Sequence, residues 1–132
     1  MVPTRNYVLL RRFSAKEERR RLTASWLLRA AEVRPYLALE NHLNYAYHAE
    51  RELTADEVHG LTALFNSALL DRYFRIISGN TQVNATEIRT MRFPTLDRVA
   101  AIGRRIKDLP DYLPAKVERV VLEEFGAGPH RY

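Results

Sequence analysis

The sequence predicts an α+β fold in which an N-terminal antiparallel β hairpin or sheet is followed by a cluster of helices. Apolar and polar residues alternate in the first third of the chain, and after residue 53 the apolar residues recur at the 3.6-residue spacing of a helix. No internal repeat or long linker divides the 132 residues. We therefore expect a single domain, 1–132, that is β-rich over residues 5–50 and helical over residues 54–126. A chain of this length can bury a core of its own.

Three segments have the pattern of strands. Residues 7–13, YVLLRRF, are short and apolar at their start, and residues 39–48, LENHLNYAYH, alternate between polar and apolar positions. Residues 21–28 alternate too, and one of their faces carries the apolar side chains of Leu22, Ala24, Trp26 and Leu28. The polar run SAKEERR lies between residues 7–13 and residues 21–28, and it predicts that these two segments form a hairpin with a charged tip.

The first predicted helix begins at Thr54, which forms a capping box with Glu57. Ser67 is a plausible second N-cap, so the helix is expected to bend or restart there. Gly79 stands where a glycine commonly ends a helix. The apolar face predicted for this stretch consists of Val58, Leu61, Phe65, Ala68, Leu69, Tyr73 and Ile76.

Three further helices are predicted. Asn84 with Glu87 caps a short helix that runs to about Met91, and Pro94 prevents it from continuing. The next helix carries its apolar residues at Leu96, Val99, Ala100, Gly103 and Ile106. Pro114 occupies the first turn of the last helix, whose apolar residues are Val117, Val120, Val121 and Phe125.

The composition favours a polyanionic partner. The chain has a formal net charge of +5, with 21 Lys and Arg against 16 Asp and Glu, and its pI is about 9.8. Basic domains commonly bind DNA or RNA, although many basic proteins bind no particular anion. The absence of cysteine excludes disulfides and thiolate chemistry. With no membrane segment and no signal peptide apparent, we expect a cytoplasmic protein that does not contact membranes.

No catalytic constellation is apparent. The chain lacks a serine nucleophile elbow, and its carboxylates occur as adjacent pairs such as Asp56 and Glu57, whose side chains point apart. His42 and His48 are about 20 Å apart along an extended strand, too far to share a metal. We therefore expect no catalytic, cofactor-binding or metal-binding residues in this chain.

Two groups of residues are candidates for DNA contact. Arg11, Arg12, Lys16, Arg19 and Arg20 cluster on the proposed hairpin, where they could grip a duplex backbone or form a solvated loop partly paired with Glu17 and Glu18. Asn80, Thr81 and Gln82 follow the predicted helix stop. Their amides and hydroxyl suit base edges, but they could also form an internal network or serve ordinary turns.

The stretches LFNSALLDRYFR (64–75) and SGNTQVNATEIR (78–89) resemble the C-terminal target-recognition region, with TaqI-like specificity, of adenine-specific DNA methyltransferases of type II restriction–modification systems. The resemblance extends over about residues 7–106. The resemblance implies that this chain is the part of the enzyme that chooses which adenine is presented to the catalytic domain. The family's cofactor loop and its Asn-Pro-Pro-aromatic motif are both missing from this sequence. S-adenosylmethionine would then bind a catalytic domain outside this chain, and this chain alone is expected to transfer no methyl group.

Three functional hypotheses follow. In the first, the chain reads the sequence of double-stranded DNA for a methyltransferase catalytic domain that is joined in cis or is a separate chain. In the second, its helical half is a protein–protein module that docks on that catalytic domain and contacts DNA little. A small independent enzyme is a weaker third hypothesis. A steep fall of DNA affinity with salt distinguishes the first from the second.

Overall fold

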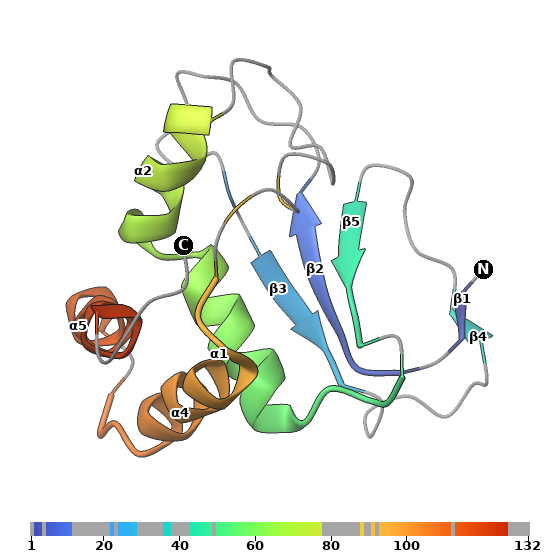
Figure 1. The fold of residues 1–132 in the computed structure, drawn as a ribbon. Coiled ribbons are helices and arrows are strands. Elements are labelled where there is room, and N and C mark those ends of the chain that lie inside the picture. Colours follow the sequence, from blue (N-terminus) through green and yellow to red (C-terminus); the bar gives the residue numbers. More distant parts are fainter. Residues whose placement is uncertain are drawn as a thin grey trace.

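The structure is a computed structural model that describes residues 2–3, 5–11, 22, 24–28, 36–37, 43–48, 50–77, 88, 91, 93–111 and 113–126. A small antiparallel sheet is followed along the chain by helices that pack together on one side of it (Figure 1). The predicted α+β fold is thus confirmed. The elements are β1 (Val2–Pro3), β2 (Tyr7–Arg11), β3 (Ala24–Leu27), β4 (Tyr36–Leu37), β5 (Leu43–Ala46), α1 (Ala55–Phe65), α2 (Ala68–Ile77), α4 (Leu96–Lys107) and α5 (Pro114–Gly126).

The main sheet has three antiparallel strands in the order β3-β2-β5. Val8 of β2 pairs with Trp26 of β3 and with Ala46 of β5, so β2 is the central strand. The hairpin predicted from the alternating segments is therefore present. Its second strand is shorter than predicted, because Leu22 and Leu28 lie outside β3. The separate pairing of β1 with β4 was not predicted, because each of these strands has only two residues and shows no alternation.

Alternation along β2 divides the sheet into a helix-facing side and an outer side. Val8 and Leu10 are buried on the helix-facing side, with Trp26 and Ala46 at paired positions. The helices complete the core beneath them. Its buried members include Leu22, Val58, Leu64, Phe65, Leu70, Phe74, Met91, Ile102, Val120 and Val121.

The local signals predicted the ends of α1 correctly. The Thr54 hydroxyl accepts a hydrogen bond from the Glu57 amide, and the Glu57 carboxylate accepts one from the Thr54 amide. The helix ends at Phe65, and α2 restarts behind Ser67, whose hydroxyl accepts from the Leu70 amide at 3.1 Å. The predicted stop at Gly79 and most of the helix predicted from Asn84 to Met91 lie outside the described residues.

The apolar face predicted for α2 is wrong at its end. Ile76 is 83% exposed, whereas Leu70 and Phe74 are fully buried. The prediction carried the helical phase of α1 straight through Asn66 and Ser67. The break at these residues resets the phase, so a different side of α2 faces the core. No helix in the described part of the chain is long and apolar enough to cross a bilayer.

The junction between α1 and α2 holds the edge of the sheet. The Asn66 side chain accepts a hydrogen bond from the Ala24 amide at 2.7 Å and donates one to the Ala24 carbonyl at 2.9 Å. Buried Asp71 accepts from the Leu22 amide at 3.2 Å and from Arg75 Nε at 2.9 Å. Asn66 thus supplies the edge strand β3 with partners that a neighbouring strand would otherwise provide. Asp71 supplies one for Leu22, just before β3. Part of the LFNSALLDRYFR stretch therefore has a structural role.

A bidentate ion pair fixes the start of α1. Arg51 donates from Nη1 and Nη2 to the two Glu57 carboxylate oxygens, each at 2.8 Å. The Glu57 side chain is only 7% exposed. The hydrogen bonds from Arg51, assisted by those from Thr54, lower the pKa of Glu57 from 4.5 to about 2. A carboxylate that is held charged in this way stabilises the fold mainly above its unfolded pKa.

We expect Glu57→Gln to lower the free energy of unfolding at pH 7 by about 1–2 kcal/mol, an amount reduced by the solvent around Arg51. Because folding lowers the pKa of Glu57, the stabilisation that its carboxylate provides is complete above about pH 4.5 and is lost as the pH falls toward 2. Urea denaturation at pH 7 and at pH 3 measures the difference. Glu123→Gln, which removes a half-exposed partner of Arg105, is the matched control. Equal stability of E57Q and the unaltered chain at pH 7 would contradict this role.

Candidate nucleic-acid interface and an apolar groove

Among the residues predicted to contact DNA, only Arg11 lies in the described part of the chain. It is the last residue of β2, is partly buried and pairs in register with Leu43 of β5. The other candidates are outside the described residues, and their role stays a prediction; they are Arg12, Lys16, Arg19, Arg20, Asn80, Thr81 and Gln82.

The described elements do show where the two candidate segments join the rest of the fold. Segment 12–21 joins the end of β2 to residue 22, and segment 78–87 follows the end of α2. In Figure 1 the end of β2 and the end of α2 lie toward the upper side of the molecule, and the chain enters β3 from that side. The hydrogen bond from the Leu22 amide to Asp71 joins the chain just before β3 to the first turn of α2. The basic segment and the amide-rich segment are thus attached at the same end of the fold.

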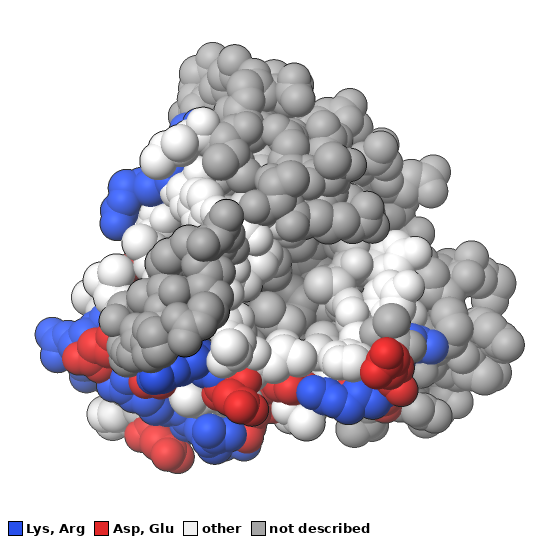
Figure 2. Space-filling view, in the orientation of Figure 1, with Lys and Arg blue, Asp and Glu red and all other residues white. Residues whose placement is uncertain are grey.

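The excess positive charge is carried by residues outside the described part of the chain. Lys and Arg balance Asp and Glu among the described residues, so the formal excess of +5 comes from the rest of the sequence. Figure 2 shows blue and red side chains intermingled along its lower edge. Among the described ion pairs, Lys107 Nζ lies 3.3 Å from an Asp56 carboxylate oxygen, and Arg105 pairs with both Glu123 and Glu124. The described helical surface is therefore an ion-paired surface and not a basic patch.

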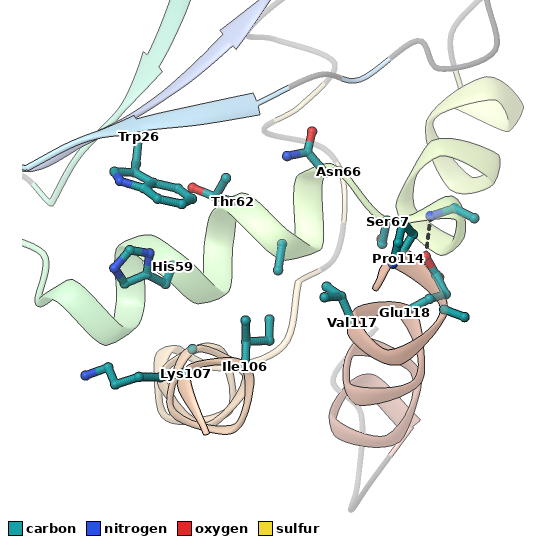
Figure 3. Close-up of a pocket in the computed structure, with 14 residues that line it drawn as sticks. Trp26, His59, Thr62, Asn66, Ser67, Ile106, Lys107, Pro114, Val117 and Glu118 are labelled. Carbon is teal, nitrogen blue, oxygen red and sulfur yellow. Dashed lines mark hydrogen bonds between the residues drawn. The ribbon is translucent and has the colours of Figure 1, made fainter. Parts of the chain in front are cut away.

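A second feature is a cavity of about 880 Å³ that opens between β3, α1, α4 and α5. Trp26 forms one wall, half exposed, and its ring meets the His59 ring edge to face with centroids 4.5 Å apart. Figure 3 shows Ile106 from α4 and Val117 from α5 on the other sides. We call this feature the Trp26 groove.

The polar side chains of Glu118, Asn66 and Lys107, which line the Trp26 groove, already have partners. Glu118 accepts hydrogen bonds from the first two amides of α2, Ala68 at 2.8 Å and Leu69 at 3.2 Å. Asn66 binds β3, and Lys107 pairs with Asp56. An apolar surface remains, which suits apolar side chains of a partner better than a charged small molecule.

The described residues hold no cluster of three or more His, Asp or Glu that could bind a metal. His59 packs on Trp26, and Glu118 caps α2. The prediction that this chain has no catalytic or cofactor-binding residues stays a prediction for the whole chain.

The chain is similar in sequence to two type II methyltransferases. The chain is 36% identical over 131 residues to the type II methyltransferase M.BsuBI of Bacillus subtilis, a match that covers 96% of this chain and 26% of the relative. It is also 36% identical over 121 residues to the type II methyltransferase M.PstI of Providencia stuartii, covering 92% of this chain and 24% of the relative. This chain is related to type II methyltransferases.

The chain spans about a quarter of the length of the curated relatives that it matches. No protein-family model matches it, and no solved structure does. The relation to type II methyltransferases confirms the predicted resemblance at the level of the enzyme class. The chain therefore corresponds to a segment of such enzymes, since the remaining three quarters of each relative have no counterpart in it.

The sequence did not predict the Trp26 groove or the hydrogen bonds by which Asn66 holds Ala24 at the edge of the sheet. The alternation of residues 21–28 placed Trp26 on an apolar face but gave no sign that it would lie half exposed beside α1. The sequence predicted a helix break at Ser67 but no role for Asn66, whose partner Ala24 is 42 residues away in the sequence. Such partners follow from tertiary packing and leave no local signal.

Proposed function

We propose that this chain is the sequence-recognition part of an adenine-specific, S-adenosylmethionine-dependent type II DNA methyltransferase, comparable in role to a TaqI-like specificity region. The observation that carries the proposal is that segments 12–21 and 78–87 are both attached at one end of the fold. The chain that carries these segments is similar to about a quarter of the length of two type II methyltransferases. One segment carries basic side chains suited to phosphates, and the other carries amides suited to base edges.

Double-stranded DNA is the proposed partner, together with a catalytic domain that is either joined in cis or a separate chain. The cofactor would bind that catalytic domain, because neither the glycine-rich loop nor the Asn-Pro-Pro-aromatic motif occurs in this sequence. The catalytic domain would extrude the adenine, and this chain would select its surroundings. Such an enzyme works where bacterial DNA is, in the cytoplasm.

The amide-rich segment gives the first test. We expect the triple variant Asn80→Ala, Thr81→Ala and Gln82→Ala to keep its melting temperature and to lose affinity for duplex DNA in a way that depends on the DNA sequence. A lost bidentate base contact costs about 1–3 kcal/mol. Fluorescence anisotropy with several duplexes, and a melting curve of the same protein, measure both effects.

The two measurements distinguish three roles of this segment. A lower melting temperature without DNA would assign the three side chains to an internal network. Unchanged melting together with unchanged binding would assign them to turn chemistry. Either result would contradict base contact by Asn80, Thr81 and Gln82.

The Trp26 groove supports a second candidate function, docking on the methyltransferase catalytic domain. A quarter-length segment must contact the rest of its enzyme, and the groove is a large apolar concavity beside α4 and α5. Apolar side chains of the catalytic domain are the occupant that we propose. This docking accompanies DNA recognition at the other end of the fold.

Trp26 is the only tryptophan of the chain, so its emission reports on the groove directly. We expect the emission to shift to shorter wavelength when the catalytic domain is added, because docking removes water from a half-exposed indole. Ala115→Glu, at an exposed residue that lines the groove, should abolish the shift. Leu122→Glu is the control, since Leu122 is exposed but does not line the groove. Loss of the shift in L122E and its persistence in A115E would contradict docking at this site.

A further inference from the structure

The outer side of the sheet carries a cluster of tyrosines that neither proposed role uses. Tyr7 and Leu9 alternate with the buried residues Val8 and Leu10, so their side chains lie on the side of β2 away from the helices. Tyr45 of β5 pairs in register with Leu9. Tyr47 lies two residues beyond it and therefore on the same side.

The three rings hold one another in place. Buried Tyr7 meets Tyr45 and Tyr47 edge to face, with centroid distances of 5.6 Å and 5.9 Å. Tyr45 and Tyr47 are close to parallel, with an interplanar angle of 23° and centroids 6.1 Å apart. They remain 42% and 49% exposed, so two oriented rings present aromatic surface to solvent. We call Tyr7, Tyr45 and Tyr47 the tyrosine cluster.

The charges beside the tyrosine cluster favour an anionic ligand. The Arg5 guanidinium carbon lies 5.2 Å from the centroid of the Tyr47 ring, and Arg11 follows Tyr7 and Leu9 on the outer positions of β2. None of the strands β2, β3 and β5 contains an Asp or Glu. Glu52 is near Tyr7, and its carboxylate accepts a hydrogen bond from the Asn6 amide at 2.9 Å. A protein partner would have to desolvate the arginines, whereas a nucleic acid brings phosphates to them.

We propose that the tyrosine cluster binds unpaired nucleotides of DNA, with bases stacking on Tyr45 and Tyr47 and phosphates facing Arg5. Exposed aromatic rings with neighbouring arginines are the chemistry that binds single-stranded nucleic acid without sequence preference. Paired bases present only their edges and could not stack on these rings. The inference rests on the proposed function, since it adds a second DNA contact to a chain that binds DNA.

Two DNA probes test the proposal, a fully paired 20-base-pair duplex and the same duplex with three unpaired thymines in one strand. We expect the unaltered chain to bind the bulged duplex more tightly. The double variant Tyr45→Leu and Tyr47→Leu should lose at least about tenfold in affinity for the bulged duplex and bind the paired duplex as before. The double variant Tyr45→Phe and Tyr47→Phe keeps the rings and should keep the preference.

The outcomes separate the two proposals. If the chain binds neither duplex, the proposed function fails and the inference fails with it. If the chain binds the paired duplex without preferring the bulge, or if the leucine pair retains the preference, the inference alone is overturned. Loss of the preference in the phenylalanine pair would also overturn it, because the hydroxyls and not the rings would then be responsible. Normal DNA binding by the leucine pair, combined with lost association with the catalytic domain, would assign the cluster to a protein interface.

A second measurement covers the case in which the leucine pair does not fold. The unaltered chain is bound to the bulged duplex with 5-iododeoxyuridine in place of the unpaired thymines, and the complex is irradiated. The cross-link is expected on Tyr45 or Tyr47 when the digested protein is analysed by mass spectrometry. Cross-links confined to other residues would overturn the proposal.

Discussion

Gly103→Ala is expected to lower the free energy of unfolding by about 3 kcal/mol, through overpacking between α1 and α4. A Cβ at Gly103 would lie 2.0 Å from the Asp56 carbonyl oxygen, and one at Gly60 would lie 1.9 Å from the Val99 carbonyl oxygen. The two glycines thus let each helix approach the backbone of the other. Since backbone atoms cannot move aside like a flexible side chain, the helices must separate.

The better helix propensity of alanine, about 1 kcal/mol over glycine, offsets only part of this cost. For a chain of this size the melting temperature should fall by about 10 °C. Arg104→Ala is the matched control, because the neighbouring Arg104 side chain is 60% exposed and its contact with the Asp56 carboxylate is long, at 4.0 Å. Thermal melting of both variants tests the prediction. A G103A variant as stable as R104A would contradict the close crossing of α1 and α4.

Replacing Arg12, Arg19 and Arg20 together by alanine is expected to weaken binding to every DNA duplex by at least about a hundredfold. Charge-assisted hydrogen bonds from arginine to phosphate are worth about 1.5–3 kcal/mol each, and they carry no sequence information. Each lost phosphate contact should also reduce the slope of log K against log salt by about one unit. Arg11 is left in place because it is partly buried at the end of β2.

The structure offers a control with the same change of charge. Arg98, Arg104 and Arg105 lie on α4, away from the end of β2 in Figure 1, and each has an acidic neighbour within 4.0 Å. Replacing these three by alanine should change DNA affinity and its salt slope little. Equal losses in the two triple variants would indicate attraction to net charge alone. A loss confined to one DNA sequence would show that Arg12, Arg19 and Arg20 read bases.

Local signals in the sequence predicted the fold well where the interaction itself is local. The capping box of Thr54 and Glu57 joins residues three positions apart, and Ser67 caps the helix that it precedes. Alternation likewise identified the strands of the hairpin. The phase of α2 was wrong because a two-residue break resets it, and no pattern on either side of the break records by how much.

The remaining features depend on which elements meet. Gly103 was placed on an apolar helix face, but its contact with the Asp56 backbone requires that α1 and α4 cross there. The hydrogen bonds between Asn66 and Ala24 and the edge-to-face contacts of Tyr7 with Tyr45 and Tyr47 depend on the packing of separate elements. Asn80, Thr81 and Gln82 were singled out because turn chemistry left them unexplained, and their contact with DNA stays a prediction.

The proposed function requires that this chain select a DNA sequence. The most direct measurement is to incubate the chain with duplexes that contain a randomised central region, recover the bound DNA and sequence it. We expect one short motif to be enriched over successive rounds, and the enrichment to disappear when Asn80, Thr81 and Gln82 are replaced by alanine. Recovery of bound DNA without any enriched motif, or no recovery of DNA at low salt, would contradict the proposed function.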